Sequence, residues 1–166
     1  WFVLSALLIG IALVLSLVDT AVSSAIPFLP GFKLGIANVA VLFALYALGA
    51  REALVISAAR CLLAALMSGA LTMLFFSLAG GLLSLLVMAL LKDRVSMVKV
   101  SVSGGVAHNM AQAAVAVFLT STPQVSYYVP FLVVLGAVSG FFIGLLCSLI
   151  LRRTALINLS FREKKG

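Results

Sequence analysis

Charged side chains are scarce in this sequence. Of its 166 residues, 9% are charged and 64% are hydrophobic, whereas about a quarter of the residues in a typical soluble chain are charged and about half are apolar. This shortage excludes an ordinary soluble domain, because too few polar side chains remain to cover its surface. Continuous apolar runs such as 82–91 indicate helices rather than the strands of a membrane barrel, in which apolar and polar residues would alternate.

Acidic residues are the rarest charged group. The chain has only Asp19, Glu52, Asp93 and Glu163, and these lie far apart in the sequence. Prenyl-diphosphate chemistry needs clustered aspartates that hold magnesium on the diphosphate. The sequence therefore excludes an active site of that kind.

Other groups that carry chemistry are also missing. His108 is the single histidine, and Cys61 and Cys147 both lie inside apolar runs, so we expect no metal or haem site and no disulfide framework. No Gly-x4-Gly-Lys-Ser/Thr motif occurs, and no serine has a histidine and a carboxylate in reach. We predict a protein that is not an enzyme and that holds no metal or cofactor.

Apolar runs of membrane-spanning character dominate the chain. A helix needs roughly 20 residues to cross a core of about 30 Å, and the first run lacks a basic leader and a cleavage site, so we expect it to be retained. We predict an all-α membrane protein, a six-transmembrane-helix bundle in one domain over 1–151 with a basic tail at 152–166. The predicted spans are 2–18, 35–49, 53–67, 70–91, 98–119 and 129–151.

The distribution of lysine and arginine predicts how these spans are oriented. With six spans, Lys33 is alone on one side, and the prolines near it interrupt the helical pattern. By the positive-inside rule the opposite side, which includes both termini, is cytoplasmic. The cations on that side are Arg51, Lys92, Arg94, Lys99, Arg152, Arg153, Arg162, Lys164 and Lys165.

Two ionisable residues are predicted to lie near the middle of the membrane. Arg60 follows Arg51 by nine residues and His108 follows Lys99 by nine, which places each roughly 13 Å from the inner edge. Asp19 is expected near the outer end of the first span, so no carboxylate shares the depth of Arg60. A buried arginine must then be matched by carbonyls, water or an anion of the substrate, and intramembrane ionisable groups are functional candidates by default.

Polar residues one turn further outward complete a candidate pocket. Asn38 and Gln112 are each predicted roughly 20 Å from the inner edge, and Asn109 adjoins His108. Together with Lys33 on the outer loop, these residues outline a binding pocket for a small polar solute. A plainer alternative is that Asn109 and Gln112 only tie helices together and that His108 is an interhelical histidine.

Small residues recur on two of the predicted spans. Gly136, Gly140 and Gly144 repeat every four residues in the last span, a pattern typical of close helix packing against an internal helix or another protein. The first span has a weaker version in Ala6 and Gly10. A terminal helix has fewer internal neighbours, so this face is a candidate for contact with another protein.

Several motifs carry a resemblance to a known family. Segment 30–38 reads Pro-Gly-Phe-Lys-Leu-Gly-Ile-Ala-Asn, and segment 105–112 reads Gly-Val-Ala-His-Asn-Met-Ala-Gln. With the strings at 44–53, 77–84 and 127–130, they make the chain resemble the Gx transporter family, also named heptaprenyl diphosphate synthase component I. The resemblance covers nearly the whole chain.

That family is similar to the substrate-binding S-components of energy-coupling factor transporters. The resemblance implies a multi-pass protein of the prokaryotic cell membrane that binds a small vitamin-like, flavin-like or isoprenoid-related molecule. It implies partners as well, a transmembrane coupling subunit and two ATPases. Ala6 and Gly10 would correspond to the docking surface, and the loop 19–34 would act as a lid.

Three functions follow as hypotheses. The first is a substrate-binding transport subunit of an energy-coupling factor system, with a site at Asn38, Arg60 and the polar residues of span five. The second is a non-catalytic membrane component associated with a polyprenyl diphosphate synthase, as the family name implies. The third is a proton- or ion-coupled carrier that uses His108.

Overall fold

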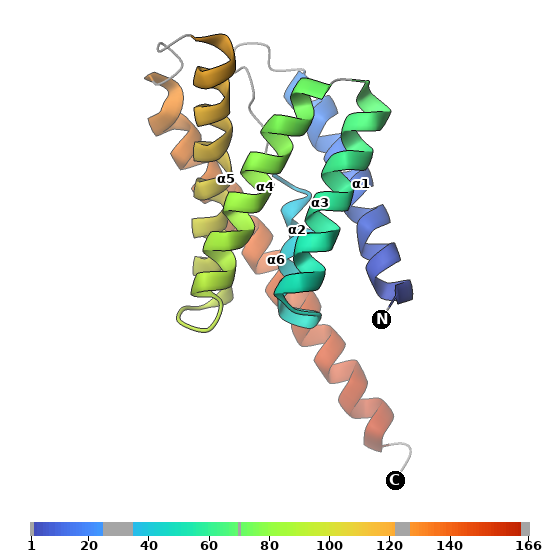
Figure 1. Cartoon of the computed structure of the whole chain (residues 1–166). Coiled ribbons are helices and arrows are strands. Elements are labelled where there is room, and N and C mark those ends of the chain that lie inside the picture. Colours follow the sequence, from blue (N-terminus) through green and yellow to red (C-terminus); the bar gives the residue numbers. More distant parts are fainter. Residues whose placement is uncertain (1, 25–34, 70, 122–126, 164–166) are drawn as a thin grey trace.

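The fold is entirely helical in the part of the chain that the structure describes, residues 2–24, 35–69, 71–121 and 127–163 of a computed structural model. This confirms the predicted all-α class. Figure 1 shows the helices as a bundle in which α6 continues past the others at one end. The six helices are α1 (Phe2–Ser24), α2 (Asn38–Ala47), α3 (Ala50–Ser68), α4 (Leu71–Leu91), α5 (Met97–Thr120) and α6 (Val129–Glu163).

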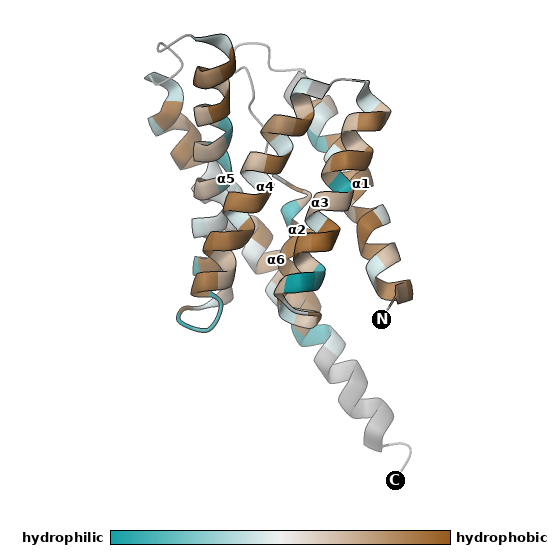
Figure 2. Ribbon diagram, in the orientation of Figure 1, coloured by the Kyte–Doolittle hydropathy of each residue, from teal (hydrophilic) through white to brown (hydrophobic). Residues whose placement is uncertain are grey.

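Four of these helices, α1, α4, α5 and α6, are long and apolar enough to cross a membrane. Figure 2 shows the apolar residues spread over their surfaces, and large side chains such as Leu86 and Phe142 are more than half exposed. Such a surface is incompatible with water and suits lipid. The chain is therefore a membrane protein.

The first two helices differ in length from the predicted spans. Helix α1 ends at Ser24 rather than near residue 18, so Asp19 lies inside the helix. Helix α2 has only 10 residues, about 15 Å of rise, which is half of the membrane core. It begins after Gly35 and ends before Gly49, two glycines with positive φ that allow the chain to turn sharply.

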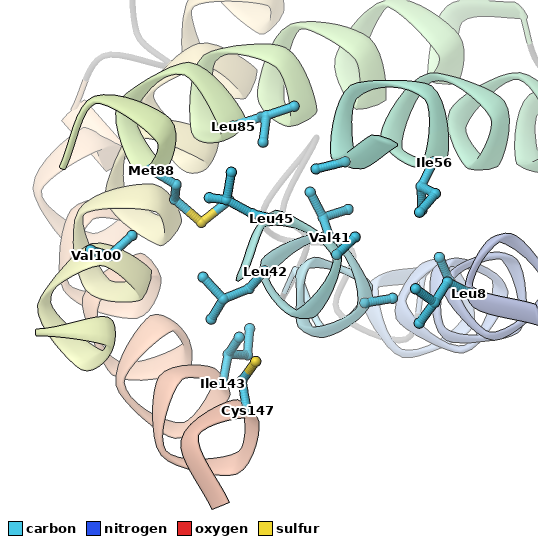
Figure 3. Packing of buried hydrophobic residues seen from close by; sticks show 14 residues of the cluster. Leu8, Val41, Leu42, Leu45, Ile56, Leu85, Met88, Val100, Ile143 and Cys147 are labelled. Carbon is cyan, nitrogen blue, oxygen red and sulfur yellow. The ribbon is translucent and has the colours of Figure 1, made fainter. Parts of the chain in front are cut away.

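Helix α2 lies at the centre of the bundle. It contacts α1, α3, α4 and α6, and Figure 3 shows Leu42 and Leu45 facing Met88 and Val100 while Val41 faces the other side of the bundle. Leu42 and Leu45 are fully buried. A helix that is apolar all round is stable in such a position because every face meets protein.

The glycines of α6 pack against α5. A Cβ atom on Gly140 would fall 2.6 Å from the carbonyl oxygen of Ser101, and one on Gly136 would fall 2.6 Å from that of Gly105. A Cβ on Gly144 would fall 2.9 Å from the Cα of Val98. The stripe that the sequence assigns either to an internal helix or to another protein therefore meets an internal helix, α5.

Candidate functional site

Arg60 is the central polar residue of the bundle. Its side chain projects from the middle of α3 and is only 5% exposed. Nη1 donates a hydrogen bond to Ser16 Oγ of α1 at 3.0 Å, and Nη2 donates to Asn38 Oδ1 of α2 at 3.2 Å. The guanidinium therefore joins three helices through neutral acceptors.

One nitrogen of this guanidinium has no partner. Arg60 Nε is buried and makes no hydrogen bond with any residue that the structure describes. An unsatisfied donor on a buried charged group costs more than about 1–3 kcal/mol, so a ligand that supplied an acceptor here would gain that amount. Arg60 Nε is thus a buried donor that the described residues leave unsatisfied.

Asp19 corrects one expectation from the sequence. It is 3% exposed and lines the same cavity as Arg60, so a carboxylate does share this layer of the bundle. Its Oδ2 accepts a hydrogen bond from the backbone N–H of Gly35 at 2.9 Å. The expectation was wrong because α1 continues past residue 18 and carries Asp19 inward, one turn beyond Ser16.

The first cavity surrounds Arg60 and has an empty volume of about 300 Å³. Its walls come from α1, α3, α4 and α5. Charged groups of both signs and neutral hydrogen-bonding groups therefore meet in one buried space. The polar residues that line it are Ser16, Asp19, Arg60, Ser77 and His108.

His108 stands between this cavity and a second one. Its ring is 4% exposed and lies against Gly80 of α4, where a Cβ atom would fall 2.8 Å from Cε1. Glycine at position 80 is thus what allows the imidazole to occupy this place. His108 and Gly35 line both cavities.

The second cavity has an empty volume of about 260 Å³ and lies between α2, α4, α5 and α6. Both cavities are narrow and have room for about one ordered water each. A solute would enter only if the side chains or helices move apart. The polar residues that line the second cavity are Asn38, Ser84, Ser101, His108, Asn109 and Ser139.

The remaining predicted site residues differ in where the structure places them. Asn109 Nδ2 donates to the carbonyl of Leu132 at 2.8 Å and so ties α5 to α6. Gln112 is 3% exposed and lines neither cavity, and both of its amide atoms lack a partner within the described ranges. Lys33, and most of the loop predicted as a lid, lie outside the described residues. The structure therefore gathers Asn38, Arg60, His108 and Asn109 around two cavities and leaves Gln112 outside them.

Six polar lining residues were not predicted from the sequence as members of the site: Ser16, Asp19, Ser77, Ser84, Ser101 and Ser139. Ser16 and Asp19 are three residues apart in an otherwise apolar helix, and that spacing puts them on one face. This signal would have been enough to add them. Nothing in the sequence marks Ser84 more than the other serines of the apolar helices.

The predicted docking residues lie on the outer surface of α1. Ala6 and Gly10 are exposed, and a Cβ atom on Gly10 would meet nothing within 4 Å. With Leu7, Ile11 and Val14 they line an apolar surface groove with an empty volume of about 760 Å³. The face is open and free of side-chain charge.

The site contains no arrangement suited to metal chemistry. Within the described part of the chain, no three His, Cys, Asp or Glu side chains gather closely enough to hold a metal ion. The arrangement offers a buried guanidinium, an acidic side chain, hydroxyls and amides, which are groups that can bind a polar solute.

The comparison with protein families gives one match. The family described as heptaprenyl diphosphate synthase component I matches residues 8–150. No curated protein and no solved structure matches the chain. The family description names a component of a synthase complex.

Proposed function

The chain belongs to the heptaprenyl diphosphate synthase component I family, and we propose that it is the substrate-binding subunit of an energy-coupling factor type transporter. In this role it holds a small polar solute at Arg60 and neighbouring residues, and it carries out no chemistry itself. The solute is vitamin-like, flavin-like or isoprenoid-related. The observation that carries the proposal is the buried Arg60 with its unpartnered Nε beside a polar cavity.

The position of α2 supports binding at this point. Asn38 is the first residue of α2 and contacts Arg60, which lies near the middle of α3. The amino end of α2 therefore lies deep inside the bundle, and its positive partial charge lies close to Gly35, which lines both cavities. Short helices that end at mid-membrane are where transporters place substrates. Guanidinium and helix end together favour an acceptor-rich group on the solute.

A membrane topology accompanies this proposal. The amino ends of α3 and α5 and the turn between α4 and α5 lie at the end of the bundle where α6 projects (Figure 1). The described cations Arg51, Arg94, Lys99 and Arg152 belong to these segments and to α6. By the positive-inside rule this end is cytoplasmic, which puts both termini there. The six helices then make six passes in a single domain, with the short α2 pass buried among its neighbours, and the protein resides in the prokaryotic cell membrane.

Partner docking is assigned to the groove on α1. Ala6 and Gly10 leave a shallow apolar channel on a helix whose outer face meets no other helix of the chain. A transmembrane coupling subunit can approach closely at small residues. Two ATPase subunits bound to that subunit would then supply the energy, since the chain has no nucleotide-binding motif.

The site is tested by ligand identification and a matched pair of variants. Native mass spectrometry of the gently purified protein should reveal a retained small molecule, whose affinity is then measured by calorimetry. Arg60→Gln should weaken that affinity by about ten- to a hundredfold, because a charged donor is lost. Arg51→Gln removes an exposed cation from the same helix and should change nothing. Absence of any bound molecule, or equal affinities of the two variants, would contradict the site.

The second candidate function is a non-catalytic membrane component of a polyprenyl diphosphate synthase. The family description favours it, and the cationic end of the bundle offers a surface for a soluble acidic enzyme. Pull-down from native membranes separates the candidates, because it recovers ATPases with a coupling subunit in one case and a soluble synthase in the other. Gly10→Leu should reduce recovery of the coupling subunit, whereas Val138→Leu on the exposed face of α6 should not.

A further inference from the structure

The two cavities follow one another along the bundle. Ser77 lines the first and Ser84 lines the second. Both belong to α4, and seven residues of helix separate them by about 10 Å along its axis. The second cavity is the one nearer the turn at 92–96. Because Gly35 and His108 line both, the cavities are adjacent compartments rather than separate sites.

The compartments differ in charge. The first contains the guanidinium of Arg60 and the carboxylate of Asp19. The residues that line the second include no Asp, Glu, Lys or Arg; their polar groups are hydroxyls, amides and the imidazole of His108. A charged group placed in the second compartment would be buried without a counter-ion, which is strongly unfavourable.

Ser84 provides the second compartment with a hydroxyl that can still form hydrogen bonds. Ser84 is only 1% exposed, and its Oγ has no hydrogen-bond partner among the residues that the structure describes. Other serines of the bundle satisfy themselves by donating to a carbonyl one turn back, as Ser139 does with Gly136 and Ser148 with Leu145. Ser84 therefore offers a free donor and acceptor inside an enclosed polar space.

The walls of the second compartment are able to adapt to a guest. Gly105 and Gly140 contribute backbone only, so that α5 and α6 form a smooth side. Met88 and Ile143 close the cavity with apolar atoms. Methionine is unbranched and flexible, so Met88 is able to move aside where a branched side chain would not.

We infer that the second cavity is a subsite for an uncharged, hydrogen-bonding part of the same solute whose acceptor-rich end lies at Arg60. This inference rests on the proposed function and narrows its substrate class. The solute is elongated, carries its ionised or acceptor-rich group at one end only, and directs its neutral polar body toward the 92–96 turn. Ser84, Ser101 and Ser139 are its further binding residues.

Cysteine labelling tests this charge preference without knowledge of the solute. Ser84→Cys is introduced with Cys61→Ala and Cys147→Ala, and its labelling rates with 2-hydroxyethyl methanethiosulfonate and with the cationic 2-(trimethylammonium)ethyl reagent are compared. Ser68→Cys, at the exposed end of α3, is the reference. The ratio of the neutral to the cationic rate should be at least about tenfold higher at position 84 than at 68, since burying the charge costs more than a tenfold factor. The thiolate fraction cancels because each ratio compares two reagents on one thiol.

Two further measurements distinguish failure of the subsite from failure of the proposed transport site. Ser139→Cys replaces Ser84→Cys if the latter does not elute as a monodisperse folded protein. Cys61, which lines the first cavity, is labelled in the Cys147→Ala chain. If Cys61 reacts while positions 84 and 139 stay unreactive or show no charge preference, the subsite is refuted and the transport site stands. If none of the three reacts, both are refuted.

Discussion

The α5–α6 contact and the surroundings of Arg60 differ in how closely they pack and in whether their polar side chains have hydrogen-bond partners. Along α5 and α6 the backbones approach so closely that a single Cβ at Gly140 would collide with the Ser101 carbonyl, and the Asn109 amide donates to Leu132. The Arg60 side chain lines a cavity instead, and its Nε makes no hydrogen bond with any described residue.

The two regions therefore show, inside one membrane bundle, polar groups that have a hydrogen-bond partner and polar groups that have none. Where Gly136 and Gly140 of α6 meet α5, the backbones approach closely, and the Asn109 side chain finds its partner in the neighbouring backbone. Beside the first cavity, one nitrogen of the Arg60 guanidinium has no partner among the described residues. A buried donor without a partner is costly, and this cost supports the proposed binding site at Arg60.

The largest effect is expected at the close contact. Gly140→Leu should destabilise the protein by about 3 kcal/mol, because the neighbouring atoms are backbone and no rotamer change relieves the overlap. The unfolding midpoint in detergent measures this loss. Gly10→Leu is the matched control, since nothing lies within 4 Å of its Cβ position. Equal midpoints for the two variants would mean that α5 and α6 do not pack as described.

A smaller effect is expected from the polar tie in the same interface. Asn109→Ala removes the bond to the Leu132 carbonyl and should cost about 0.6 kcal/mol, the mean for such bonds between membrane helices. Chemical unfolding of the variant beside Ser148→Ala, whose exposed hydroxyl bonds within its own helix, measures the difference. A change of several kcal/mol would place Asn109 in a larger network than this single bond.

The smallest change in stability is expected at Arg60, the buried cation of the first cavity. The double variant Arg60→Met/Asp19→Asn loses two hydrogen bonds to neutral groups but no longer buries the guanidinium or the acidic side chain of the first cavity, so the two terms should offset to within about 0.5 kcal/mol. Thermal unfolding of the ligand-free protein provides the measurement. A loss as large as that of Gly140→Leu would show that Arg60 and Asp19 hold the fold together, and the contrast between the two regions would disappear.

Much of the site was accessible from periodicity and depth. Counting residues from Arg51 and Lys99 placed Arg60 and His108 in one layer, and the structure has both on the first cavity. Asn38 was predicted one turn away and hydrogen-bonds Arg60. These placements could be estimated because a helix rises by a constant amount per residue, whereas the binding role of the three residues stays a prediction.

Other features depend on contacts between helices, which local sequence patterns do not predict. The buried position of Asp19 follows from where α1 stops, and apolar residues on both sides of it leave the end of the helix undetermined in the sequence. The brevity of α2 has the same origin, since a buried helix has no need to span the bilayer. Gln112 has the right depth and yet lines neither cavity.

The sequence by itself determined that the chain is helical, suited to a membrane and without acidic clusters for diphosphate chemistry, because composition and helical rise are properties of each segment alone. Only the tertiary structure decided which helix meets the glycine stripe, that a carboxylate accompanies Arg60, and which polar atoms stay unsatisfied. Those outcomes depend on distances between segments far apart in the chain, and such distances are set by how all the helices pack together.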